Sequence, residues 1–344
     1  MNIKTEITKL HYDKNASGLF MDLLEFFSLF YGLVTTVRNS LYDKGILKEV
    51  KVDAEVISVG NMTTGGVGKT PIVAEIAATF IDRGEKVAII TRGYGGKLSN
   101  KKVNLISDGI NLFHKADMAG DEAYWLAVNL NMCAVLTSKD RVKAAKYAIE
   151  KLGVTKIILD DAFQYRKIHR DLNIMVVDSE KMFGNEKLLP AGPLREGMEA
   201  VKRIDKLVVV NKSKDDTKAE KLARILGKKF KCGSSICKTT PHYVYNIKTG
   251  DNLVSGEAVI AVCAIGQPDQ FYRFLKPTYE VLKTISFDDH HIYTKSDIEN
   301  IRGNIITTEK DAVKLAKFDF DNIFALKLKT DLDIEGLLSH DRHW

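Results

Sequence analysis

The sequence predicts an α/β protein built around a mainly parallel sheet, on the basis of two observations. From residue 55 onwards, short apolar runs rich in β-branched residues alternate with segments of helical periodicity. A second, shorter alternation of the same kind begins near residue 240. Strands that alternate with helices form parallel sheets with helices on both faces. We therefore expect a larger α/β domain followed by a smaller α/β domain.

The first alternation supplies six predicted strands and four predicted helices. The strands are expected at 55–59, 86–91, 132–137, 155–159, 172–177 and 206–210, and the helices at 69–82, 121–130, 139–152 and 216–230. The second alternation supplies strands at 242–247, 257–264, 278–286, 304–308 and 322–328, and helices at 268–275, 295–301 and 309–317. Ligands of open parallel sheets bind at the carboxyl ends of the strands, so a functional site is expected there.

Residues 19–42 precede these alternations and form an apolar segment with helical spacing. Its uninterrupted apolar stretch, 26–37, is shorter than the roughly 20 residues of a transmembrane helix. Three interpretations stay open: a helix packed on the core, a helix lying in the plane of a membrane surface, and a true span. The first eighteen residues are mixed polar and do not resemble a signal peptide. Because they lack a pattern, Met21 is a second candidate for the first residue of the protein.

The composition excludes several classes of protein. Hydrophobic residues make up 45% and charged residues 28% of the 344 residues, which suits a globular protein and argues against disorder or many membrane spans. The net charge of +6 is too small for a dedicated nucleic-acid binder. Residues 201–231 alone carry +7, which indicates either a solvated helix face or a patch facing anionic lipid or a phosphorylated substrate. Four cysteines without metal spacing are expected to be reduced thiols.

The strongest motif is EVISVGNMTTGGVGKTP at 55–71, where an apolar strand leads through a glycine-rich turn into a helix. This is the context of a phosphate-binding P-loop, in which backbone N–H groups and the helix N-terminus surround phosphates. The expected nucleotide-binding residues are Thr63, Thr64, Gly65, Gly66, Val67, Gly68, Lys69 and Thr70. Lys69 should reach the β- and γ-phosphates, and the hydroxyl of Thr70 should bind Mg²⁺. The motif departs from the usual pattern at Thr63, where glycine is expected.

A second motif, KIILDD at 156–161, completes the expected metal site. An apolar strand that ends in carboxylates is typical of a Walker-B strand, and we therefore expect Asp160 or Asp161 to bind Mg²⁺. Guanine recognition is not expected, because Lys214 stands where the NKxD motif requires Asp. ATP is therefore the expected nucleotide, and the fold is expected to be of the P-loop NTPase type.

Further short motifs follow predicted strands, and together with the P-loop they resemble those of one family. They are TRGYGG (91–96), AGDEAYW (119–125), DDAFQYRKIHRD (160–171), LLPAGPLRE (188–196), FDDHHIY (287–293) and TTEKDAVKL (307–315). In this order they resemble the tetraacyldisaccharide 4'-kinases over about residues 19–330. That family also has Thr at the position of Thr63, whereas Tyr165 and Ala162 depart from residues common in the family.

The resemblance implies transfer of the γ-phosphate of ATP to the 4'-hydroxyl of a tetraacylated glucosamine disaccharide 1-phosphate, giving the bis-phosphorylated lipid A precursor. By this analogy Asp121 is the catalytic base, and His290, with His291 as its rival, orients or polarises it. The expected domains are a membrane-associating helical segment (1–50), a nucleotide-binding core (51–235) and a smaller α/β domain (236–344). Asp121 and His290 then belong to different domains, whose closure would complete the site.

The acceptor is expected to contact Arg92, Tyr94, Glu122, Gln164, Arg195 and Glu196. A lipid acceptor resides in a membrane, which favours an interfacial helix at 19–42 and a place at the cytoplasmic face of the bacterial inner membrane. The alternative function is a P-loop ATPase that acts as a switch or assembly factor without a lipid acceptor. That alternative explains the P-loop and Asp160–Asp161, but it explains neither the amphipathic segment nor the DHH motif.

Overall fold

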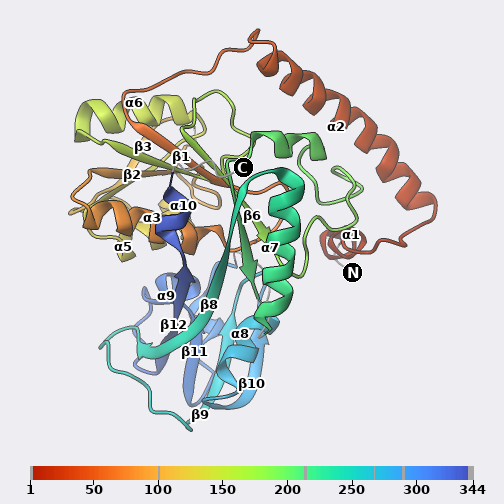
Figure 1. The fold of residues 1–344 in the computed structure, drawn as a ribbon. Helices are drawn as coiled ribbons and strands as arrows, with labels where there is room; N and C mark the ends of the chain where they lie inside the picture. Colours follow the sequence, from red (N-terminus) through yellow and green to blue (C-terminus); the bar gives the residue numbers. More distant parts are fainter. Residues whose placement is uncertain (1–2, 100, 213–214, 267, 289–290, 340–344) are drawn as a thin grey trace. The chain divides into compact units, whose positions relative to one another are not determined.

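The computed structural model describes residues 3–99, 101–212, 215–266, 268–288 and 291–339. The chain divides into two compact units, each assembled from separate stretches of sequence (Figure 1). Unit 1 comprises Met1–Ile89, Arg141–Cys237 and Leu332–Trp344, and unit 2 comprises Ile90–Asp140 and Lys238–Asp331. Strands β2 (Val87–Thr91), β8 (Gly233–Asn246) and β12 (Ile323–Leu332) each pass from one unit to the other.

Unit 1 contains a parallel sheet in the order β5-β1-β6-β7. Its strands are β1 (Glu55–Gly60), β5 (Lys156–Asp160), β6 (Leu172–Asp178) and β7 (Lys206–Asn211). They are buried almost throughout, which explains why each reads as a continuous apolar run. Helix α3 (Lys69–Asp82) packs on β1 and β5, and α7 (Asp216–Phe230) packs on β7. The remaining elements are α6 (Arg141–Leu152), the 3₁₀ helix η1 (Met198–Arg203) and α10 (Ile334–Leu338).

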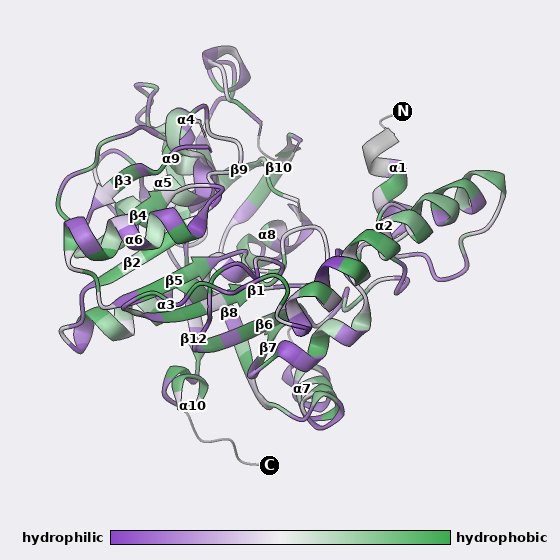
Figure 2. Ribbon diagram, turned by 90° about the horizontal axis from the view of Figure 1, so that it is seen from above, coloured by the Kyte–Doolittle hydropathy of each residue, from purple (hydrophilic) through white to green (hydrophobic). Residues whose placement is uncertain are grey.

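The N-terminal part of unit 1 is formed by α1 (Ile3–Leu10) and the 25-residue helix α2 (Leu19–Asp43). One face of α2 is buried at Met21, Leu24, Ser28 and Asn39, at spacings of three, four and eleven residues that keep these side chains on one side of a helix. Figure 2 shows hydrophobic residues along much of α2. Large apolar side chains are exposed along it: Leu19, Phe20, Leu23, Phe26, Phe27, Leu29, Phe30, Leu33, Val34 and Val37.

Unit 2 contains a second parallel arrangement in the order β10-β9-β11-β12. Its further strands are β9 (Ala258–Cys263), β10 (Glu280–Ser286) and β11 (Asn304–Thr308), and β3 (Asn104–Asp108) pairs antiparallel with β4 (Cys133–Thr137). The helices are α4 (Ala116–Ala119), α5 (Asp121–Asn129), α8 (Pro268–Leu275), η2 (Lys295–Asp297) and α9 (Glu309–Leu315). Helix α5 packs against α4, α9 and β4.

The predicted fold class is confirmed, with differences that include four elements. Strand β3 and helix α4 were not predicted, because their polar residues interrupt the apolar pattern. Strand β8 begins nine residues before the predicted strand at 242, in a largely exposed stretch. The helix predicted at 295–301 is only the three-residue η2, whose Asp297 carboxylate forms a capping box with Thr294. The predicted three-domain boundaries stay a prediction, although segment 90–140 clusters with unit 2.

Candidate active site

The predicted phosphate-binding loop connects β1 to α3 in unit 1. Lys69 and Thr70 are the first two residues of α3, so both lie where the N–H groups of the helix lack intrahelical partners. Gly68 precedes them at φ 90°, a left-handed conformation that glycine adopts without steric cost. This geometry presents backbone donors, a helix N-terminus and an ammonium group to an anion.

The departure at Thr63 has a structural explanation. Thr63 is buried, and its backbone carbonyl and its Oγ1 accept hydrogen bonds from the Asn61 amide at 2.7 and 3.1 Å. Thr64 is held in turn by its N–H, which donates to the carbonyl of Pro193 at 2.8 Å. Thr63 does not adopt a positive φ, so this position of the loop does not need glycine.

Lys69 lies in a cluster of charged and polar groups at the end of β5. Its Nζ donates to Asn61 Oδ1 at 2.9 Å and lies 3.1 Å from Asp161 Oδ1. Arg195 NH1 donates to both carboxylate oxygens of Asp161, at 3.0 and 2.9 Å. Burial alone would raise the pKa of Asp161, but the charges of Lys69 and Arg195 outweigh it and hold that pKa well below its ordinary value. Asp161 is therefore ionised at neutral pH.

The donors that the sequence predicts for Mg²⁺ occupy adjacent elements of unit 1. Asp160 is the last residue of β5, Asp161 follows it, and Thr70 lies in the first turn of α3 beside β5. Within the described parts of the chain, no group of three or more His, Cys, Asp and Glu residues could hold a metal. Mg²⁺ usually binds one or two carboxylates together with substrate phosphates, so carboxylates beside a hydroxyl and a phosphate-binding loop fit this ion.

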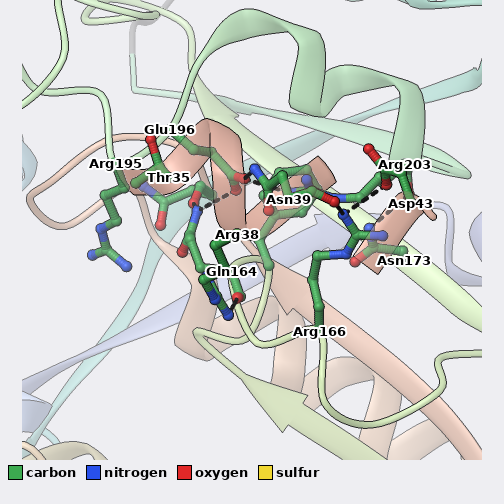
Figure 3. Close-up of polar contacts among 12 residues, drawn as sticks. Thr35, Arg38, Asn39, Asp43, Gln164, Arg166, Asn173, Arg195, Glu196 and Arg203 are labelled. Carbon is green, nitrogen blue, oxygen red and sulfur yellow. Dashed lines mark hydrogen bonds and ion pairs between the residues drawn. The ribbon is translucent and has the colours of Figure 1, made fainter. Parts of the chain in front are cut away.

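The buried Glu196 and the half-buried Gln164 lie in a polar layer beside Asn39 and Arg38 of α2 (Figure 3). Glu196 is 2% exposed and accepts hydrogen bonds from Asn39 Nδ2 at 3.0 Å, Gln164 Nε2 at 3.1 Å and Arg203 NH2 at 2.7 Å. Gln164 Nε2 also donates to the carbonyl of Asn61 at 2.9 Å. These two residues are thus engaged with the protein itself, and their predicted contact with the acceptor stays a prediction.

In unit 2, the RGYGG and GDE motifs form adjacent loops. Lys97 N and Leu98 N donate to the carbonyls of Asp117 and Met118 at 3.1 and 3.0 Å. Gly120 lies so close to this loop that a Cβ would come within 2.5 Å of the Tyr94 carbonyl oxygen. The contact places the backbone of the exposed residue Tyr94 beside the start of α5, where Asp121 lies.

Asp121, the predicted base, is the first residue of α5 and forms an ion pair with a lysine of α9. Lys314 Nζ lies 2.9 Å from Asp121 Oδ2 and 3.3 Å from Asp311 Oδ1, and its side chain is only 8% exposed. Asp311 is fully buried and accepts hydrogen bonds from Ala264 N and Thr308 Oγ1, both at 2.9 Å. The neighbouring Glu122 pairs with Lys310 at 3.3 Å. Lys314 is therefore a fixed cation that orients Asp121.

Of the two candidate histidines, His290 lies outside the described residues. His291 Nε2 is 3.0 Å from Asp297 Oδ2, and its ring stacks on Phe287 with centroids 4.5 Å apart. His291 is thus engaged in holding the loop before η2.

Three residues of these clusters were missed by sequence reasoning. Asn61 follows β1 directly, and its position in the VGN motif could have indicated it. Lys314 lies one turn after the Asp of TEKDA, on the same face of α9. Lys212 follows β7 and contacts both Asp178, at 2.9 Å, and the loop carbonyl of Gly66, at 3.1 Å.

Comparisons with known proteins agree on one family. Residues 20–340 match the family model described as tetraacyldisaccharide-1-P 4'-kinase. The tetraacyldisaccharide 4'-kinase of Aquifex aeolicus is 37% identical over 91% of this chain and 95% of its own length. The tetraacyldisaccharide 4'-kinase of Syntrophus aciditrophicus is 34% identical over 93% of this chain and 91% of its own length. A crystal structure of LpxK from Aquifex aeolicus in complex with ATP superposes with a TM-score of 0.74 at 33% identity, covering 92% of this chain and 96% of that one.

Proposed function

This chain belongs to the tetraacyldisaccharide 4'-kinase family and is an ATP-dependent kinase of the lipid A precursor, and we propose that Lys69 and Asp121 are its main catalytic residues. The observation that carries this assignment is the position of Lys69, which lies at the N-terminus of α3 beside the Asp161 carboxylate. The alternative of a P-loop ATPase without a lipid acceptor is not favoured by the family.

In the proposed reaction, the oxygen of the acceptor 4'-hydroxyl attacks the γ-phosphorus of ATP. A new P–O bond forms, the bond between the γ-phosphorus and the bridging oxygen breaks, and ADP leaves with that oxygen. The amides of residues 63–70 and the Lys69 ammonium bind the phosphates and neutralise the charge that develops on them. The hydroxyl proton passes to the Asp121 carboxylate, which the ion pair with Lys314 keeps oriented.

We further propose that Thr70, Asp160 and Asp161 hold Mg²⁺, which supplies charge neutralisation at the phosphates when bound. The Asp161 carboxylate is ionised and 35% exposed, so it could bind the ion while Lys69 remains beside it. We expect Asp160→Asn and Asp161→Asn to raise the Mg²⁺ concentration that gives half-maximal rate by about tenfold or more. An unchanged Mg²⁺ dependence in both variants would contradict the assignment.

The role of Asp121 is tested separately from nucleotide binding. General-base catalysis contributes about 10²–10⁴-fold, so Asp121→Asn should lower kcat by about 100-fold or more with the Kd for ATP unchanged. His290→Ala should lower kcat more than tenfold, whereas His291→Ala, which loses only a loop contact, should retain most of it. An active His290→Ala with an inactive His291→Ala would transfer the role to His291.

For the acceptor, we propose contacts from Arg92, Tyr94, Glu122, Arg195 and the neighbouring Gln164–Glu196 layer. A guanidinium binds phosphate through two parallel N–H bonds, which suits Arg92 and Arg195 to a phosphorylated sugar. Arg92→Met should therefore raise KM for the lipid acceptor more than KM for ATP.

The lipid acceptor also gives α2 a role, and we propose that this helix lies in the membrane surface at the cytoplasmic face of the inner membrane. By length and composition α2 could cross a membrane. However, its side chains bond to the rest of unit 1 at Ser28, whose Oγ donates to the Leu188 carbonyl, and at Asn39, which donates to Glu196. A helix held this way presents only its opposite, apolar face to lipid, as interfacial helices do.

A further inference from the structure

The core-facing side of α2 carries polar groups as well as the apolar residues Met21 and Leu24. Tyr31 Oη donates to the carbonyl of Arg195 at 2.7 Å, and Arg38 NH2 donates to the carbonyl of Gln164 at 2.8 Å. Asn39 is 8% exposed, donates to Glu196 and accepts a hydrogen bond at its carbonyl from Arg166 NH1 at 3.1 Å. Membrane attachment alone does not require such buried hydrogen bonds.

These contacts continue to Lys69 by a chain of hydrogen bonds. Asn39 Nδ2 donates to Glu196 at 3.0 Å, and Gln164 Nε2 donates to the other oxygen of Glu196 at 3.1 Å. The same Gln164 nitrogen donates to the Asn61 carbonyl at 2.9 Å, and the Asn61 side chain accepts from Lys69 Nζ at 2.9 Å. Glu196 and Asn61 are 2% and 1% exposed, so water competes little for these bonds.

A second, independent route joins α2 to the same lysine. Tyr31 fixes the backbone of Arg195, whose guanidinium binds both oxygens of Asp161, and Asp161 lies 3.1 Å from Lys69 Nζ. Both routes begin on one face of α2, eight residues apart, and both end on the ammonium that the proposed function assigns to the phosphates of ATP. Figure 3 shows the Asn39–Glu196–Gln164 part of the first route.

We propose that α2 positions Lys69 for ATP, with Asn39 and Tyr31 as the positioning residues, in addition to forming the surface that faces lipid. Glu196 only accepts hydrogen bonds, so the nitrogen of Asn39 faces it, and Asn39 and Arg203 together hold the carboxylate in one orientation. That orientation holds the Gln164 amide against Asn61, and Asn61 holds Lys69. A loop lysine with several allowed positions would bind the phosphates less tightly and react more slowly. The proposal rests on the proposed function only for the identity of the phosphate-binding lysine.

The test is Asn39→Leu, which keeps the size of the side chain and removes its donor. Thr35→Val is the matched control, because Thr35 lies on the same helix between Tyr31 and Asn39 and its Oγ1 donates to Gly32 O of α2 itself. For each purified full-length variant, the Kd for ATP is measured by calorimetry without acceptor. The values of kcat and KM for the lipid acceptor, and pelleting with phosphatidylglycerol vesicles, are measured alongside.

We expect Asn39→Leu to raise the Kd for ATP and to lower kcat by about fivefold or more each, with vesicle pelleting within twofold of wild type. Thr35→Val should match wild type throughout. The proposal would be overturned if Asn39→Leu binds ATP with the wild-type Kd. It would also be overturned if the loss of ATP binding equals the fraction of Asn39→Leu that is unfolded. If Asn39→Leu does not fold, Tyr31→Phe, which removes one hydroxyl, provides the same comparison with the same criteria. The Kd for ATP is measured without acceptor. Failure of the proposed lipid-kinase function would therefore be seen separately, because the wild-type protein would then transfer no phosphate from ATP to the lipid acceptor.

Discussion

The apolar face of α2 allows a quantitative prediction for membrane binding. The side chains of Phe26 and Phe30 lie one helical turn apart, with ring centroids 5.1 Å apart, and are 54% and 57% exposed. Full burial of a Phe side chain is worth about 1.5–3 kcal/mol, so transfer of the exposed half of each ring into lipid should contribute about 1 kcal/mol. Replacing both rings should therefore cost about 2 kcal/mol, or about 30-fold in the partition coefficient.

The double variant Phe26→Ser/Phe30→Ser tests this value by sedimentation with vesicles of phosphatidylcholine and phosphatidylglycerol. Both rings are exposed, so the thermal unfolding midpoint should stay close to that of the wild type. Ile110→Ser is the control, because Ile110 is 90% exposed but lies in the turn after β3, outside α2. If the double variant pellets with vesicles as strongly as wild type and the control, α2 does not face lipid.

Two further predictions concern the ion pairs of the candidate site. Arg195→Met removes two charge-assisted hydrogen bonds from the partly exposed Asp161 and should lower the free energy of unfolding by about 1–2 kcal/mol at pH 7. Because the wild-type pKa of Asp161 lies below its unfolded value, this stabilisation is present above pH ~4 and lost as the pH falls further. In urea unfolding, the difference in the free energy of unfolding between variant and wild type should therefore narrow below pH 4. A difference that does not depend on pH would show that the ionised Asp161–Arg195 pair is not the source of the stabilisation. Lys314→Met leaves the partly buried Asp121 carboxylate and the fully buried Asp311 carboxylate without their shared cation and should cost about 3–5 kcal/mol of stability. A thermal midpoint equal to that of wild type would refute the role given to this pair.

The parts of the site that were predictable from the sequence are those formed by residues close together in the chain. The loop between β1 and α3 needs a strand, a glycine-rich turn and a helix start, and all three lie within residues 55–71. Likewise, Asp160 and Asp161 directly follow an apolar strand, whose end faces the ligand side of a parallel sheet.

The contacts that escaped prediction join residues far apart in the sequence. Asn39 and Glu196 are 157 positions apart, and no pattern in either segment indicates the other. The pair of Asp121 and Lys314 depends on the packing of α5 against α9, which periodicity alone does not specify. For α2, the hydropathy of residues 19–42 left three interpretations open. The composition of a helix does not show which of its faces packs on the protein core and which is left for solvent or lipid.

Phosphate transfer to a lipid acceptor is the central step of the proposed function. The measurement is the incubation of purified protein with Mg²⁺, ATP labelled in the γ-phosphate and tetraacylated disaccharide 1-phosphate in detergent micelles, followed by chromatography of the lipids. We predict label in a bis-phosphorylated lipid at the 4'-position, ADP formation that requires the acceptor, and loss of both in Asp121→Asn. Release of labelled inorganic phosphate at the same rate with and without acceptor, and no labelled lipid, would contradict the proposed function.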